Sequence, residues 1–168
     1  MISELAIKVG RALAERGWRL ATAESCTGGL VAGAITDVAG SSGWFERGFV
    51  TYSNEAKVEL LGVRPETLVR FGAVSAETAR EMAAGALARS AAHVAIAVTG
   101  VAGPTGGTPD KPVGLVWLAW AVGDRPAEVE SRRFAGDRAA VREASVREAL
   151  AGLLGRLWLW CAAVLEIG

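Results

Sequence analysis

Several residue types are scarce in this chain, and each scarcity excludes a class of protein or site. The 168 residues include two cysteines, Cys26 and Cys161, and a single histidine, His93. Two cysteines are too few for a disulfide framework, and with one histidine they cannot complete a four-ligand zinc site without several carboxylates. We therefore expect neither a disulfide nor a metal site. His93 heads a predicted buried strand, so it is not expected to act as a catalytic base.

The sequence also has no excess of charge and no long apolar run. It carries 18 basic and 18 acidic side chains, a formal net charge of zero, whereas binding to a nucleic-acid backbone needs a concentrated positive face. A membrane-spanning helix needs about 18 consecutive apolar residues, and the longest candidates, Val113–Gly123 and Leu157–Leu165, are shorter. The start, Met1–Leu5, contains an acid rather than the basic stretch of a secretory signal. The sequence thus predicts a cytoplasmic protein whose partner is neither a nucleic acid nor a membrane.

Hydrophobic residues are abundant, at 51%, and their spacing predicts helices that alternate with strands. Helical periodicity and capping residues predict helices over about 2–16, 30–38, 54–61 and 75–90, and a long last helix that Asp137 caps. Apolar or alternating runs predict strands over 19–23, 48–53, 93–98, 113–122 and 128–134, the last two forming a hairpin. This order indicates an α/β fold of three layers (α/β/α), with helices covering a mixed sheet. The length fits a single domain, 1–168.

The end of the last predicted helix is apolar on more than one face. A stripe spaced at three and four residues runs through Leu150, Leu153, Leu154, Leu157, Trp158 and Cys161. The segment that continues to Leu165 adds more apolar side chains than a surface helix needs. Two interpretations stay open, a helix buried in the core and a helix that joins the subunits of a homo-oligomer.

The first candidate site segment is Glu24–Gly29, which follows a predicted strand. If the next helix begins near Thr27, the Ser25 hydroxyl lies at its positive end, where free backbone N–H groups stabilise an anion or an oxyanion. Ser25 is then a candidate nucleophile, although the same position suits a serine that only caps the helix. Cys26 competes for the nucleophile role because a helix N-terminus lowers the pKa of a thiol, and a small buried packing residue is the alternative.

The second segment, Tyr52–Lys57, supplies a candidate base. With Asn54 as the N-cap of the predicted helix, Lys57 occupies the third helical position, where its charge opposes the helix dipole. The positive helix end and partial burial lower the pKa of such a lysine, which makes a neutral amine available to deprotonate a serine. Tyr52 is a candidate to relay a proton or to orient the amine. The alternative is that Lys57 is a solvated charge paired with a neighbouring glutamate.

The third segment is the loop 99–114, whose sixteen residues are uncommon without regular structure in a compact domain and usually functional. Between Thr99 and Pro112, four glycines and three prolines prevent regular structure. Glycines let backbone amides approach a ligand closely, and successive N–H groups form anion-binding concavities. We expect a phosphate there, with Lys111 and Arg138 as counter-charges. The glycine spacing matches neither the P-loop nor the dinucleotide fingerprint, and an ordinary surface loop is the alternative.

Five motifs together resemble the CinA C-terminal-domain family over nearly the whole chain, in order and with few gaps. They are Ala23–Gly29, Tyr52–Lys57, Gly72–Ser75, Thr99–Gly107 with Lys111–Gly114, and Phe134–Arg138. Longer members of that family add an N-terminal nucleotide-processing domain, so this sequence resembles the single-domain form. Its stand-alone members are nicotinamide-nucleotide amidases.

The resemblance implies hydrolysis of the carboxamide of nicotinamide mononucleotide, a reaction of NAD salvage, to nicotinic acid mononucleotide and ammonia, without a metal or cofactor. It implies Ser25 as nucleophile, Lys57 as general base and proton donor, and Tyr52 as a supporting hydroxyl; a Ser-Lys pair is a known alternative to the histidine triad. Oxyanion-hole amides are expected near Thr27 or Gly100. The remaining substrate contacts are expected from Gly28, Asn54, Thr99, Gly103, Gly106, Gly107, Lys111 and Arg138.

Two other functions stay open at this point. One is a non-catalytic nucleotide-binding or interaction module of the same fold, which keeps a pocket without turnover. The other is an amidase that acts on a different phosphorylated amide.

Overall fold

A computed structural model describes residues 1–165 of the chain, and the side chains of residues 1–160. The elements in order are α1 (Ile2–Arg16), β1 (Leu20–Glu24), α2 (Leu30–Thr36), the 3-10 turn η1 (Ser41–Gly43), β2 (Phe45–Val50), α3 (Asn54–Leu61), α4 (Pro65–Phe71), α5 (Ala76–Ala88), β3 (Val94–Gly100), β4 (Leu115–Val122), β5 (Glu128–Arg133) and α6 (Arg138–Leu165). In this part of the chain, no helix is both long enough and apolar enough to cross a membrane.

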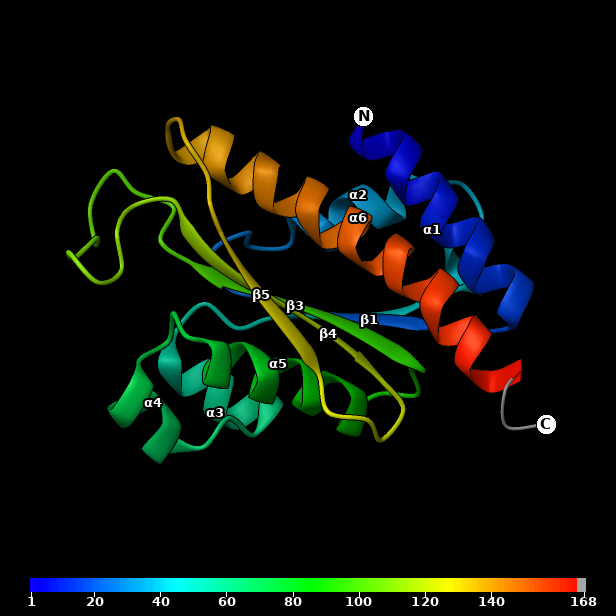
Figure 1. The fold of residues 1–168 in the computed structure, drawn as a ribbon, viewed down its shortest axis with the longest axis horizontal. Coiled ribbons are helices and arrows are strands. Elements are labelled where there is room, and N and C mark those ends of the chain that lie inside the picture. The colour runs from blue at the N-terminus through cyan, green and yellow to red at the C-terminus, as the bar shows by residue number, and fades with distance from the viewer. Residues whose placement is uncertain (166–168) are drawn as a thin grey trace.

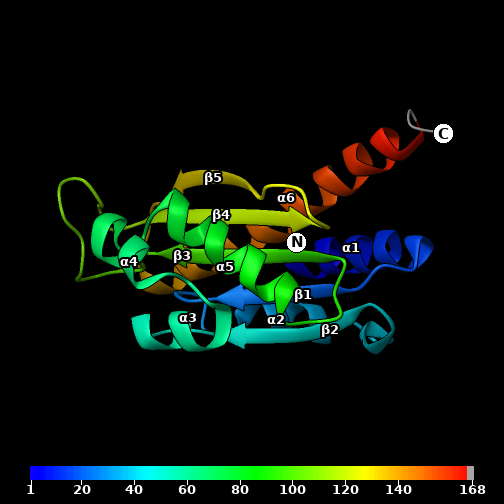
Figure 2. The same ribbon diagram turned by 90° about the horizontal axis from the view of Figure 1, so that it is seen from below.

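The five strands form one mixed sheet in the order β2-β1-β3-β4-β5 (Figure 2). β1 runs parallel to both β2 and β3, whereas β4 and β5 form the predicted antiparallel hairpin at one edge. Helices α1, α2 and α6 cover one face of the sheet, and α3, α4 and α5 cover the other (Figure 1). The predicted three-layer α/β fold is confirmed.

Side chains of different size separate the two faces of the sheet, because successive strand residues point to opposite faces. Towards α1, α2 and α6 the strands present large residues, including Leu20, Ile96, Val98, Leu118 and Trp120. Towards α5 they present Ala21, Ala23, Ala95, Ala97, Ala119 and Ala121. These short side chains let α5 lie close to the sheet. A Cβ at Gly85 of α5 would lie 1.9 Å from the backbone oxygen of Leu61, so α3 is also held close to α5.

Helix α2 begins at Leu30, the start of the predicted helix 30–38, and ends at Thr36, with Gly29 as its N-cap. The start near Thr27, which would place Ser25 at the positive end of the helix, is not observed. The reason is that Gly28 and Gly29 have φ values of 57° and 102°, which a right-handed helix does not accommodate.

The cap of α3 also differs from the prediction. Ser53, not Asn54, is the N-cap, and its Oγ accepts a hydrogen bond from the backbone N–H of Ala56 at 3.0 Å. Serine and asparagine are both good caps, so the local sequence does not separate them. Lys57 therefore lies at the fourth helical position, not the third.

One strand boundary and one whole helix also differ from the prediction. β2 spans Phe45–Val50 rather than 48–53, because the chain leaves the sheet after Thr51, whose N–H bonds to Glu24 O at 2.8 Å. Helix α4 was not predicted, although Pro65 in its first turn is a start signal of helices.

The apolar end of α6 is divided between core and surface. Leu157 is fully buried and Trp160 is 5% exposed, whereas Trp158 and Leu159 are 65% and 70% exposed. The rest of the predicted interface segment, from Cys161 to Leu165, lies outside the described side chains.

Candidate active site

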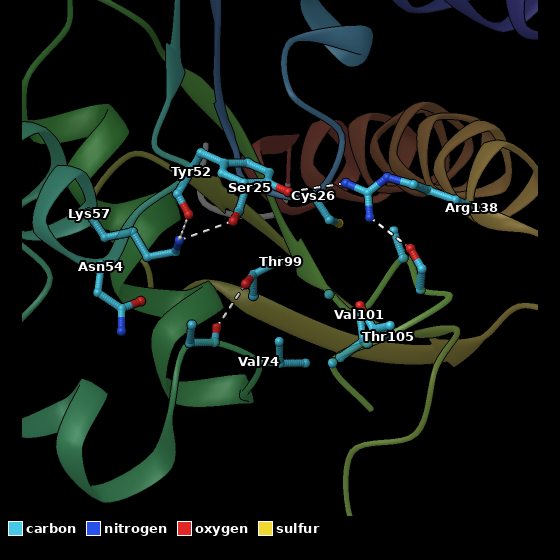
Figure 3. A pocket seen from close by; sticks show the side chains of 15 residues that line it. Ser25, Cys26, Tyr52, Asn54, Lys57, Val74, Thr99, Val101, Thr105 and Arg138 are labelled. Atoms are coloured by element: carbon cyan, nitrogen blue, oxygen red, sulfur yellow. Dashed lines mark hydrogen bonds between the residues drawn. The ribbon is translucent and has the colours of Figure 1, made fainter. Parts of the chain in front are cut away.

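A pocket of about 390 Å³ opens where the parallel strands β1 and β3 end, the edge at which α/β sheets bind ligands. Figure 3 shows residues from all three candidate segments around it. The lining residues are Ser25, Cys26, Tyr52, Asn54, Lys57, Ala73, Val74, Thr99, Gly100, Val101, Ala102, Gly103, Thr105, Gly106 and Arg138. Its size is that of an ordinary small-molecule site.

The centre of the pocket is a contact between a lysine and a serine that are 32 positions apart. Lys57 Nζ lies 3.0 Å from Ser25 Oγ (Figure 3). The same nitrogen lies 2.8 Å from the carbonyl oxygen of Thr51 and 3.3 Å from that of Tyr52. These carbonyls face the amine because the chain between β2 and α3 turns around it.

The environment of Lys57 favours its neutral form. The side chain is 1% exposed, and this burial lowers the pKa of the amine from its ordinary value. A third carbonyl oxygen, that of Ser53, lies 3.5 Å from the nitrogen. The neutral amine has one lone pair, which is able to accept the proton of the Ser25 hydroxyl. The interpretation of Lys57 as a solvated charge is therefore wrong.

Ser25 is held by its backbone and by the residue before it. Its N–H donates to Val98 O at 2.9 Å, and its carbonyl accepts from Gly28 N at 3.0 Å. The helix N-terminus is capped instead by Glu24, whose carboxylate accepts from the N–H groups of Val31 at 2.8 Å and Ala32 at 3.0 Å. The interpretation of Ser25 as the cap of α2 is therefore wrong.

Glu24 has no predicted role, although the sequence contains a signal for one. The first N–H groups of a helix need acceptors, and glycines at the start of α2 cannot supply a side chain. An acid just before such a turn is the obvious candidate.

Cys26 packs in the interior rather than acting as a thiolate. Its side chain is 6% exposed, and burial raises the pKa of the thiol to about 11. At neutral pH the group is a thiol, which is a weak nucleophile.

Tyr52 and Arg138 form a link across the mouth of the pocket. Arg138 Nη2 donates to the Tyr52 hydroxyl at 3.1 Å, and Nη1 donates to Gly103 O at 2.8 Å (Figure 3). The Tyr52 side chain is 62% exposed. Its backbone carbonyl, not its hydroxyl, is the part that contacts Lys57.

The predicted substrate contacts divide into two groups. The structure brings Asn54, Thr99, Gly100, Gly103, Gly106 and Arg138 to the pocket, and it places Thr27, Gly28, Gly107 and Lys111 outside its lining. Thr99 Oγ1 also donates to Ala73 O at 2.8 Å, which fixes a wall that the sequence analysis did not single out as lining.

Lys111 has a different contact from the one expected. Its ammonium donates to the carbonyl of Phe71 at the end of α4, where a cation suits the negative end of a helix.

Across residues 1–160, no cluster of three or more His, Cys, Asp or Glu side chains has the arrangement of a metal site.

Comparisons with known proteins extend over the whole site. A family model described as the CinA C-terminal domain matches residues 2–157. The nicotinamide-nucleotide amidohydrolase PncC of Enterobacter agglomerans is 55% identical over 141 residues, covering 84% of this chain and 86% of its own length. The protein of that name from Escherichia coli K12 is 53% identical over 157 residues, covering 94% and 93%. A crystal structure of the competence damage-inducible protein A from Klebsiella pneumoniae has a TM-score of 0.92 at 46% identity, covering 95% and 98%.

Proposed function

This chain belongs to the family of CinA C-terminal domains, and on that premise we propose that it hydrolyses nicotinamide mononucleotide to nicotinic acid mononucleotide and ammonia. Relatives more than 50% identical carry the name nicotinamide-nucleotide amidohydrolase. The observation that carries the proposal is the 3.0 Å contact between the buried Lys57 amine and the Ser25 hydroxyl. It supplies a nucleophile and its base without a histidine.

Acylation begins with proton transfer from Ser25 Oγ to the neutral Lys57 amine. The oxygen attacks the carboxamide carbon, and the carbonyl π electrons move to its oxygen, which becomes an oxyanion. The ammonium of Lys57 then gives its proton to the carboxamide nitrogen, the C–N bond breaks, and ammonia leaves. A serine ester of the nicotinate ring remains, and Lys57 is neutral again.

Deacylation repeats the sequence with water. Lys57 removes a proton from a water molecule, the hydroxide attacks the ester carbon, and the bond to Ser25 Oγ breaks. Lys57 returns the proton to Oγ, which frees the carboxylate product. One amide and one water are consumed, and one carboxylic acid and one ammonia are formed.

We assign the phosphate of the substrate to the loop after β3 and to Arg138. Arg138 uses one N–H of each terminal nitrogen on Gly103 O and the Tyr52 hydroxyl, and a guanidinium has five N–H groups. The others are available to an anion. In this proposal Lys111 acts through the loop, since its ammonium contacts Phe71.

The test is ammonia release from nicotinamide mononucleotide, with nicotinamide and its riboside compared at equal concentrations. A phosphate-binding loop predicts turnover of the mononucleotide alone. Ser25→Ala and Lys57→Met are each expected to reduce kcat by at least about 10²–10³-fold, because members of a catalytic unit fail together. Lys8→Met, at an exposed lysine, is the matched control and is expected to keep the rate.

Other results would select another function. Binding of the mononucleotide without ammonia release, and with unchanged affinity in Lys57→Met, would indicate a non-catalytic module. Turnover of a different phosphorylated amide alone would keep the chemistry and change the substrate.

We further propose that copies of the chain associate through the end of α6. Support comes from the exposure of Trp158 and Leu159 in a segment whose sequence stays apolar to Leu165. Light scattering is expected to show an oligomer that Trp158→Glu dissociates; a monomeric wild type refutes this part. A cytoplasmic location stays a prediction from the sequence.

A further inference from the structure

Behind the Ser25–Gly29 turn lies a half-buried arginine that the proposed chemistry does not use. Arg142, on α6, donates from Nε to Cys26 O at 3.1 Å and from Nη2 to Thr27 O at 3.3 Å. A Cβ at Gly28 would lie 3.3 Å from Nη2, so the guanidinium lies against the turn. Arg142 does not line the pocket that holds Ser25 and Cys26. It therefore contacts the turn from the side away from that pocket.

The contacts of Arg142 fix the direction of two peptide units. In a planar trans peptide, the C=O and the N–H of the next residue point in opposite directions. With the Cys26 and Thr27 carbonyls directed to Arg142, the N–H groups of Thr27 and Gly28 are directed away from it. The second consequence is visible, because Gly28 N donates to Ser25 O at 3.0 Å.

The first consequence concerns the backbone N–H of Thr27. Thr27 is fully buried and does not line the pocket, so this N–H is directed into the protein and not towards the substrate. The two contacts of Arg142 therefore fix the path of the chain directly after Ser25.

We propose that Arg142 is a positioning residue, which holds the Ser25–Gly29 turn and thereby keeps Ser25 Oγ in place beside Lys57 Nζ. The inference rests on the proposed amidohydrolase function. Arg142 itself touches neither the Lys57–Ser25 pair nor the pocket. Arg142 is in none of the salt bridges among the described side chains. An ion pair therefore does not explain its position.

The test compares Arg142→Met and Arg142→Lys with Arg147→Met. Arg147 is on the same helix, is 51% exposed and pairs with Glu143 at 3.0 Å, so its loss controls for removal of a helix charge. For Arg142→Met we expect kcat to fall about 10²-fold, the scale for a misplacement of a reacting group by about 1 Å, with KM within about threefold because the pocket lining is intact. Arg142→Lys retains a charge but only one of the two contacts, so an intermediate kcat is expected.

A readout independent of turnover follows the turn itself. In Arg142→Met, the amide NMR resonances of Cys26, Thr27 and Gly28 are expected to shift, while those of β3 stay in place. Added guanidinium ion is expected to restore part of the kcat of Arg142→Ala and none of that of Ser25→Ala. Near-UV circular dichroism confirms that each variant is folded.

The outcomes separate this inference from the proposed function. An Arg142→Met enzyme with the kcat of Arg147→Met, or a loss confined to KM, overturns the role of Arg142 and leaves the amidohydrolase intact. A wild-type protein that releases no ammonia overturns the function; the amide resonances then decide alone, and unshifted resonances overturn the positioning of the turn.

Discussion

The burial of the Lys57 amine predicts how the free energy of unfolding depends on pH. Its amine is 1% exposed, and burial lowers its pKa in the folded protein, whereas in the unfolded chain the pKa is about 10.4. Between the two values the unfolded state binds more protons, so the free energy of unfolding rises with pH in that window. Below the folded pKa the full penalty is present, and above about 10.4 it disappears.

The size of the effect follows from linkage. Each unit by which the pKa is lowered corresponds to about 1.4 kcal/mol of lost stability at low pH. Lys57→Met removes the ionisable group and keeps most of the volume, but it leaves the carbonyls of Thr51 and Tyr52 without a donor, at about 1–3 kcal/mol each. The absolute stabilities of the two proteins therefore do not test the argument, and the difference in slope does.

The measurement is urea unfolding of wild type and Lys57→Met at intervals from pH 6 to pH 10. We expect wild type to gain stability relative to Lys57→Met as the pH rises, and Lys8→Met, at an exposed site, to follow wild type. In the same range kcat/KM is expected to rise with a limb below the pH at which an ordinary lysine titrates. Parallel stability curves for wild type and Lys57→Met would refute the lowered pKa and with it the neutral base.

Three other substitutions test the site and the layer beneath it. Cys26→Ala is expected to keep ammonia release within about threefold while Ser25→Ala loses it, because the thiol pKa is about 11; the reverse result in the same assay makes Cys26 the nucleophile. Glu24→Gln replaces one of the two carboxylate oxygens by an NH2 group, which cannot accept a hydrogen bond. We expect a stability loss of about 1–3 kcal/mol in urea unfolding and a lower kcat in initial-rate assays. Unchanged values contradict the capping role of Glu24. Gly85→Ala is expected to lose about 1–3 kcal/mol, despite the higher helix propensity of alanine, because its Cβ would meet the Leu61 backbone oxygen at 1.9 Å; an unchanged melting temperature contradicts this.

The proximity of Ser25 and Lys57 could be predicted from the sequence because the topology brings the ends of parallel strands together. Both residues follow strands of predicted βα units, and such strands end at one edge of a sheet. The motif spacing therefore predicts a serine and a lysine at that edge. The three-layer arrangement follows from the same pattern, whereas the 3.0 Å between Lys57 Nζ and Ser25 Oγ comes from the structure.

Contacts between residues that are far apart in the chain could not be predicted from the sequence. Lys111 reads locally as a loop cation beside a phosphate site, yet its ammonium bonds to Phe71, forty positions earlier. Arg142 reads as one more charge on an amphipathic helix, and only the packing of α6 against the turn reveals its two carbonyl acceptors. Local residue type fixes what a side chain is able to bind, and tertiary packing decides which group it meets.

A lysine that acts first as base and then as acid needs surroundings that accept both protonation states. A carboxylate beside the amine would hold the proton, but no described carboxylate forms an ion pair with Lys57. Neutral carbonyls solve this problem. Those of Thr51 and Tyr52 occupy two N–H donors in either state, so the third position of the nitrogen is a lone pair before proton transfer and an N–H after it. That position faces Ser25 Oγ. After the attack, this oxygen and the leaving nitrogen are bonded to the same carbon, so the new N–H of Lys57 lies close to the nitrogen that it must protonate.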